Sequence, residues 1–159
     1  MSITPALPAF PLTTLTEFQS GETELSVGMD LVLMSRIQAS VERFGTRFLT
    51  RVFTPEEQAY AQSSSPLMFE RLAARFAAKE AALKALGLAG HGVAWVDMGV
   101  VRQADGSVAL LLSGQARALA ERMGVLQTAL SISHDGAYAA AVVAAIVRKK
   151  YDRKPDVHT

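Results

Sequence analysis

The chain has 159 residues, a formal net charge of +1 at neutral pH and a hydrophobic fraction of 50%. This balance is typical of one globular domain, and it argues against a disordered chain or a polycation that binds nucleic acid. The absence of cysteine excludes disulfides, thiolate metal sites and cysteine nucleophiles, and three scattered histidines argue against a zinc site. Any metal would be held by carboxylates, which favours a hard ion such as magnesium.

The two ends of the sequence differ from its middle. Residues 1–24 contain three prolines and no lysine or arginine, so they resemble neither a secretory signal nor a transit peptide, and we expect a flexible arm. Residues 148–159 are expected to form a solvated basic tail. The longest apolar run, residues 137–147, is too short to cross a bilayer. These features predict a cytoplasmic protein that does not enter a membrane.

Apolar periodicity and turn residues predict the elements between residues 25 and 147. We expect, in chain order, a buried strand (25–33), a helix with Ile37, Val41, Phe44 and Phe48 on one face, a capped short helix (54–62), a long helix (67–86), a hairpin (94–102 and 107–112), a helix (114–123) and two strands (126–133 and 138–147). This order predicts an α+β domain in which a mainly antiparallel sheet packs on the long helix.

The most informative segment lies in the long helix and reads RFAAKEAALKALG, at residues 75–87. Glu80 and Lys84 are four residues apart and therefore project side by side, with Arg75 about one turn earlier. A carboxylate flanked by cations suits a metal ion that must sit beside a phosphate. Taken alone, the segment also fits an alanine-rich helix with a solvated Glu/Lys pair. Gly87 is expected to end the helix.

Two further segments accompany this helix. They are Val27-Gly-Met-Asp30 at the end of a strand and Ser131-Ile-Ser-His134 before the last strand. The three segments together resemble the 4′-phosphopantetheinyl transferases, and specifically the short holo-acyl-carrier-protein synthase type, over residues 25–147. The resemblance implies the fold of that family and, typically, a homotrimer with active sites between subunits.

The resemblance also implies a reaction and its site residues. The phosphopantetheine arm of coenzyme A would move to a serine of an apo acyl-carrier protein, and 3′,5′-ADP would leave. Asp30 and Glu80 match the family's magnesium ligands, and Lys84 would stabilise charge on the leaving group, so these three residues are the expected catalytic set. Arg75, Lys79, Lys84 and His134 are the expected coenzyme A contacts. The base that deprotonates the serine is left open between Glu80, acting through a metal-bound water, and solvent.

The helix after the first strand carries a run of arginines. Arg36, Arg43 and Arg47 share the helix face beside its apolar stripe. A charged helix face is usually only solvated, but carrier proteins present their serine at the start of an acidic helix, and Arg36 corresponds to a family arginine that meets the carrier. We therefore expect these three arginines to dock the carrier.

Two departures from the family pattern bear on substrate affinity: Gly99 stands where an acidic residue is common, and the loop at 63–66 lacks a lysine. Related two-lobed enzymes have a third acidic ligand where this chain has Val32, as the short type leads us to expect, and a water would fill that position. Two competing functions are a catalytically weak module that binds coenzyme A or a carrier, and a nucleic-acid binder using the arginines and the basic tail. The second lacks interleaved aromatics and a recognition motif, so we expect no nucleic-acid partner. The carrier's pathway is open, with fatty-acid synthesis as the default.

Overall fold

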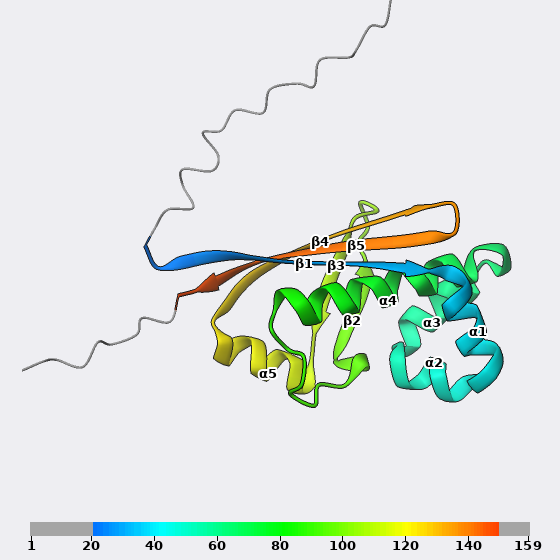
Figure 1. Cartoon of the computed structure of the whole chain (residues 1–159), viewed down its shortest axis with the longest axis horizontal. Coiled ribbons are helices and arrows are strands. Elements are labelled where there is room, and N and C mark those ends of the chain that lie inside the picture. Colours follow the sequence, from blue (N-terminus) through cyan, green and yellow to red (C-terminus); the bar gives the residue numbers. More distant parts are fainter. Residues whose placement is uncertain (1–20, 150–159) are drawn as a thin grey trace, which may run out of the picture.

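A computed structural model describes residues 21–149 of the chain and has the predicted α+β architecture (Figure 1). Its elements are β1 (Thr23–Leu33), α1 (Met34–Phe44), α2 (Thr46–Val52), α3 (Pro55–Gln62), α4 (Met68–Ala85), β2 (Met98–Arg102), β3 (Val108–Leu112), α5 (Gly114–Met123), β4 (Val125–Asp135) and β5 (Tyr138–Arg148), with short 3-10 turns at Ser65–Leu67 and Trp95–Asp97. Residues 1–20 of the predicted arm (1–24) and residues 150–159 of the predicted tail (148–159) lie outside the described residues.

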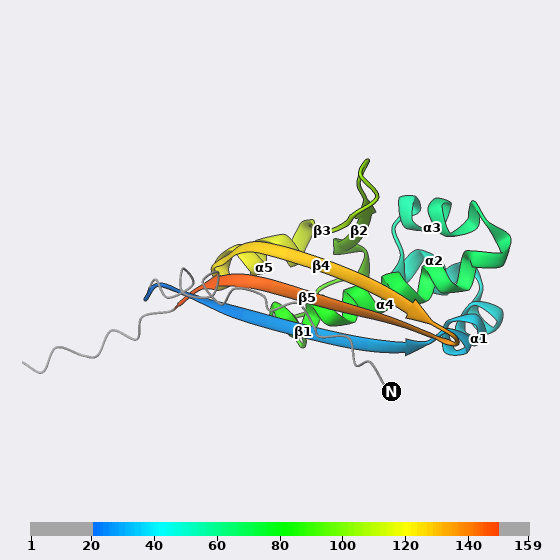
Figure 2. The ribbon, with the colours of Figure 1, turned by 90° about the horizontal axis from the view of Figure 1, so that it is seen from above.

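The strands form two antiparallel sheets around the long helix. The larger sheet has the order β1-β5-β4, and β2 pairs with β3 in a separate hairpin. Helix α4 lies against the larger sheet, mainly under β1 and β5, while α1, α2 and α3 gather near its first turns and α5 lies near its last (Figures 1 and 2). The face that α4 turns inward is rich in alanine, including Ala77, Ala78 and Ala81, all fully buried. Small side chains let the helix approach the sheet closely.

The prediction of a wholly buried first strand is wrong. Successive residues of a strand point to opposite faces, and the burial of β1 follows this alternation from Leu25 to Val32. Gly28 and Val32 are buried toward α4, whereas Leu25, Val27, Met29 and Leu31 on the other face are 57%, 57%, 59% and 56% exposed. We call these four residues the outer face of β1. A continuous apolar stripe on a protein surface is typical of a site that contacts another molecule.

The expected single helix around residues 37–48 is broken at Gly45. This glycine adopts φ +54°, a backbone conformation that other residues rarely adopt, and it separates α1 from α2. Ile37 is buried as expected, but Phe44 is exposed, with the Arg43 guanidinium 5.0 Å from its ring centre. Phe48 belongs to the second helix and packs against the core from there. The predicted apolar face is therefore divided between two short helices.

Several local predictions are confirmed and others need correction. The Thr54 hydroxyl accepts the Glu57 N–H while the Glu57 carboxylate accepts the Thr54 N–H, which is the predicted capping box. The strand expected from residue 94 begins only at Met98, because a 3-10 turn precedes it. Helix α5 is capped by Asp97, whose carboxylate accepts the Gln115 N–H, and not by the Ser113 side chain.

The first strand begins at Thr23, so the last residues of the predicted arm belong to the sheet. None of the helices in the described residues is long and apolar enough to cross a membrane. A cytoplasmic location stays a prediction.

Candidate functional site

The site begins where β1 crosses α4. A Cβ atom built on Gly28 would lie 2.6 Å from the Ala85 nitrogen and would overlap the Ala81 carbonyl oxygen. Only glycine therefore permits this approach of strand and helix. Two residues earlier, the Ser26 hydroxyl donates a 2.6 Å hydrogen bond to the Ala85 carbonyl. These contacts fix the position of Asp30, two residues further along the same face, relative to the second half of α4.

Asp30 and Glu80 line one cleft of about 310 Å³, and Arg36 and Phe76 also line it. The Lys84 ammonium donates to Asp30 Oδ1 at 2.8 Å and to the Met29 carbonyl at 2.9 Å. Asp30 and Glu80 thus line one cleft and Lys84 binds Asp30, although Asp30 and Lys84 are 54 residues apart in the chain. We call this cavity the carboxylate cleft.

The charges in the carboxylate cleft influence one another. Partial burial raises the pKa of Glu80, and the negative charge of Asp30 raises it further, while Lys84 opposes the shift. The pKa of Lys84 is raised chiefly by its hydrogen bond to Asp30. A cation between Asp30 and Glu80 would offset the repulsion between their two negative charges.

The donor set fits a hard divalent ion. No group of three or more His, Cys, Asp or Glu side chains in residues 21–149 is arranged to hold a metal, so water and phosphate oxygens would complete the coordination of an ion held by Asp30 and Glu80. Mg²⁺ commonly keeps several waters and one or two carboxylates, which agrees with this pair.

Lys79 does not fill its predicted role as a coenzyme A contact. Its side chain is fully buried, and its ammonium contacts Glu57 Oε2 at 2.7 Å, the Val52 carbonyl at 2.6 Å and the Trp95 carbonyl at 3.1 Å. An ammonium has three N–H donors, so all of them are used within the core. Burial lowers the pKa of Lys79 and the Glu57 charge opposes this shift. Glu57 also accepts the Val100 N–H at 2.8 Å, so this ion pair links α2, α3, α4 and β2.

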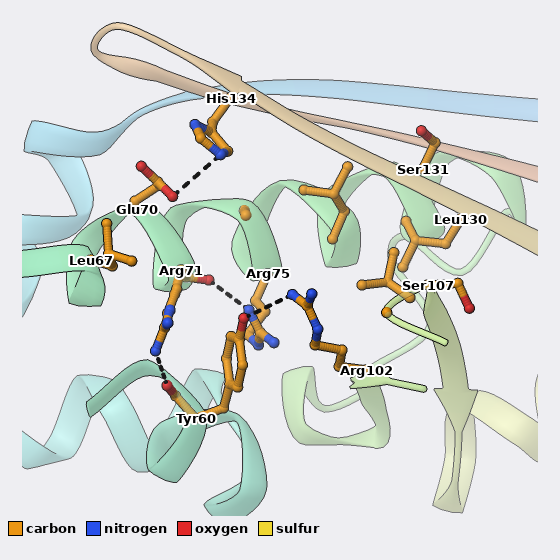
Figure 3. A pocket seen from close by; sticks show the side chains of 14 residues that line it. Tyr60, Leu67, Glu70, Arg71, Arg75, Arg102, Ser107, Leu130, Ser131 and His134 are labelled. Atoms are coloured by element: carbon orange, nitrogen blue, oxygen red, sulfur yellow. Dashed lines mark hydrogen bonds and ion pairs between the residues drawn. The ribbon is translucent and has the colours of Figure 1, made fainter. Parts of the chain in front are cut away.

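A second cavity of about 580 Å³ lies on another side of α4 (Figure 3). Its lining includes Arg71, Arg75, Arg102, His134 and Tyr60. The Arg71 and Arg75 guanidinium carbons lie 4.4 and 4.2 Å from the centre of the Tyr60 ring. Arg102 Nη1 donates to the Tyr60 hydroxyl at 3.2 Å. We call this cavity the arginine cleft.

Two of the predicted coenzyme A contacts lie in the arginine cleft. Arg75 is only 5% exposed, burial lowers its pKa, and its Nε is a buried donor without a partner among the described residues. His134 is the penultimate residue of β4 rather than part of the turn, and its Nε2 lies 3.4 Å from Glu70 Oε1. Several guanidinium groups held close together repel one another, so the cleft is suited to an anion.

The predicted site residues therefore fall into two groups instead of one. Arg75 and Lys84 are nine residues apart on α4, and at 100° per residue they point in opposite directions. Asp30 and His134 lie on β1 and β4, the two outer strands of the larger sheet. The two clefts have no lining residue in common. In one chain, the helix separates them.

The predicted docking arginines are all exposed, but they do not share one helix face. Arg36 and Arg43 are on α1, whereas Arg47 lies beyond the Gly45 break on α2. Arg36 also lines the carboxylate cleft. Of the three arginines, Arg36 alone lines the cleft that holds the expected metal ligands Asp30 and Glu80.

Sequence reasoning missed Tyr60, Arg71 and Arg102. Arg71 could have been found, since it is four residues before Arg75 on the same helix. The other two could not, because their positions depend on how α3 and the β2–β3 hairpin pack beside α4.

Comparisons with known proteins agree with this geometry. A family model described as the 4′-phosphopantetheinyl transferase superfamily matches residues 26–143. The holo-[acyl-carrier-protein] synthases of Gloeobacter violaceus and Solibacter usitatus are each 47% identical, over 80% and 75% of this chain and 97% and 95% of theirs. An ACPS–CoA complex from Chronobacterium ammoniagenes superimposes with a TM-score of 0.70 and 34% identity, over 80% of this chain and 99% of that chain. The chain therefore belongs to the 4′-phosphopantetheinyl transferase superfamily and, within it, to the holo-[acyl-carrier-protein] synthases.

Proposed function

We propose that the chain transfers the 4′-phosphopantetheine group of coenzyme A to a serine of an apo acyl-carrier protein, with release of 3′,5′-ADP. The observation that carries this proposal is that Asp30 and Glu80 line one cleft and Lys84 pairs with Asp30, through a strand–helix approach that only Gly28 allows. A protein that merely bound coenzyme A would need no such pair of carboxylates beside a lysine.

Asp30, Glu80 and Lys84 each have a proposed chemical role. Asp30 and Glu80 would hold Mg²⁺, which when bound neutralises charge on a pyrophosphate. Lys84 would place a further positive charge near the leaving group. Glu80 would also receive the serine proton through an intervening water.

The arginine cleft is the proposed site for the 3′-phosphate of coenzyme A. A phosphate monoester dianion would relieve the repulsion among Arg71, Arg75 and Arg102 and supply an acceptor for the free Nε of Arg75. His134 would add a donor from β4. The relative with bound CoA supports the presence of a coenzyme A site in this fold.

We further propose a homotrimer with sites between subunits. The outer face of β1 is a continuous apolar stripe, and Val142 of β5, which pairs with Met29, is also exposed. Burying such a stripe against neighbouring copies would stabilise an assembly. The separation of the two clefts supports the same arrangement, because a neighbour can bring its arginine cleft to the carboxylate cleft of the first chain.

The carrier protein would approach across the mouth of the carboxylate cleft. Arg36 lines that cleft, and Arg43 and Arg47 are exposed on the adjoining helices. An acidic carrier helix would be steered by these charges, which should alter the encounter rate and its salt dependence more than the chemical step.

The direct test is to incubate the chain with coenzyme A, Mg²⁺ and a panel of apo carrier proteins and to weigh the carriers by mass spectrometry. A mass gain of one phosphopantetheine group is expected, together with its loss by orders of magnitude in Glu80→Gln and Asp30→Asn. No gain on any carrier, with coenzyme A still bound, would instead favour a catalytically weak binding module.

A further inference from the structure

The free enzyme already holds a cation at the proposed metal site, and that cation is Lys84. Its ammonium lies 2.8 Å from Asp30 Oδ1 and 2.9 Å from the Met29 carbonyl oxygen. Carboxylate and carbonyl oxygens are the ligands that a hard metal ion would choose. The ammonium therefore occupies a coordinating direction of one of the two proposed metal ligands.

This inference rests on the proposed function, in which the Lys84 ammonium lies near the leaving group of coenzyme A. The Lys84 ammonium and a divalent ion held by the same Asp30 carboxylate repel each other, so each weakens the other's contact with Asp30. Its side chain is 51% exposed, so it has room to move. Exposed ion pairs are weak, and little would be lost when this one opens.

We propose that Lys84 is an internal competitor of the metal: it neutralises Asp30 in the free enzyme and is displaced when the ion binds. Its ammonium is then released beside the cleft, where the pyrophosphate of coenzyme A offers it a new partner. Binding of the metal ion would therefore favour the contact between Lys84 and the substrate, and this contact would in turn favour binding of the metal ion. Substrate makes the exchange favourable, so the metal binds more weakly to the free enzyme than to its complex with coenzyme A.

The inference is tested by metal affinity in the absence of substrate. Mn²⁺ binding to the full chain is measured by titration with electron paramagnetic resonance detection, which reports free ion without any catalytic turnover. Lys84→Met should bind Mn²⁺ up to about fivefold more tightly than the unaltered chain, because this is the most that opening one exposed ion pair can cost the metal.

Two control variants separate competition from a general loss of positive charge. Lys149→Met removes a lysine next to the Thr23 end of β1, about 23 Å along the strand from Asp30, and should leave Mn²⁺ affinity unchanged. Arg36→Met removes a charge that lines the same cleft, although no hydrogen bond or ion pair within residues 21–149 joins Arg36 to Asp30. It should strengthen binding clearly less than Lys84→Met.

The outcomes distinguish this inference from the proposed function. Equal Mn²⁺ affinity in Lys84→Met and the unaltered chain would overturn the competition and leave the metal site standing. An equal gain from Arg36→Met and Lys84→Met would also overturn it, in favour of a general field effect. If neither the unaltered chain nor Lys84→Met bound Mn²⁺ while the chain still modified a carrier with Mg²⁺ present, the competition would fall and the transferase function would survive.

Discussion

Replacing Gly28 with alanine should damage both stability and activity, because strand β1 and helix α4 touch at this residue. The added methyl group would lie 2.6 Å from the Ala85 nitrogen and 3.0 Å from the Lys84 Cβ, in addition to its overlap with the Ala81 carbonyl. Two of these three atoms are backbone, so no side chain can turn away to make room. The strand or the helix must move instead.

The size of the effect follows from the overlap. Ordinary non-bonded contacts of carbon need about 3.5 Å, so the two elements must separate by roughly 1 Å. Overpacking of this kind costs about 3 kcal/mol when backbone cannot relax easily. For a domain of this size that corresponds to a fall in melting temperature of about 10 °C. A displacement of 1 Å between Asp30 and Glu80 should lower kcat/KM about a hundredfold.

Gly99→Ala is the matched control. Gly99 is also a buried strand glycine, but a Cβ there would lie no closer than 3.7 Å to its neighbours, which is an ordinary contact. Its melting temperature should stay within about 2 °C of the unaltered chain. Both variants are compared by thermal unfolding and by carrier modification. If Gly28→Ala matched Gly99→Ala in both assays, the close approach of β1 and α4 would not be what builds the cleft.

Three other predictions concern the anion site, the assembly and a carboxylate. Arg75→Met and Arg102→Met should raise KM for coenzyme A far more than for dephospho-coenzyme A, and an equal rise for both would exclude a 3′-phosphate site in the arginine cleft. Val27→Lys, on the outer face of β1, should give monomers by light scattering with an unchanged circular dichroism spectrum; a persistent trimer would refute the proposed interface. Glu80 has a raised pKa, so the folded state binds its proton more tightly than the unfolded state, and the stability this gives is present at low pH and lost as pH rises through the raised value. Glu80→Gln should therefore be more stable than the unaltered chain at pH 7, with the advantage shrinking toward pH 4, and a pH-independent difference in melting temperature would contradict this.

Local signals in the sequence were sufficient where the interaction itself is local. The Thr54–Glu57 capping box spans three residues, and the pairing of Glu80 with Lys84 on one side of α4 follows from helical spacing alone. The association of Asp30 with that helix followed from the family resemblance, since no local rule brings a strand residue to a helix so distant in sequence.

The predictions that failed depend on packing between distant elements. Lys79 and Glu80 are adjacent in the sequence, yet the Lys79 side chain points into the core because it forms a buried ion pair with Glu57 of α3. The periodicity of apolar residues could not reveal that Gly45 would end α1, since a glycine within a helical pattern is often tolerated. The outer face of β1 was predicted to be buried because apolar residues in a sequence do not reveal whether they face the core or the surface.

The buried ion pair between Glu57 and Lys79 also has a consequence for the register of α4. A helix that slid by one residue along the sheet would rotate its side chains by about 100°, which would turn Glu80 out of the carboxylate cleft. Such a slip would strand the Lys79 charge in the core without its partner, at a prohibitive electrostatic cost. The Lys79–Glu57 ion pair thus allows only one rotation of α4 about its axis, and this rotation also fixes the direction in which the adjacent Glu80 side chain points.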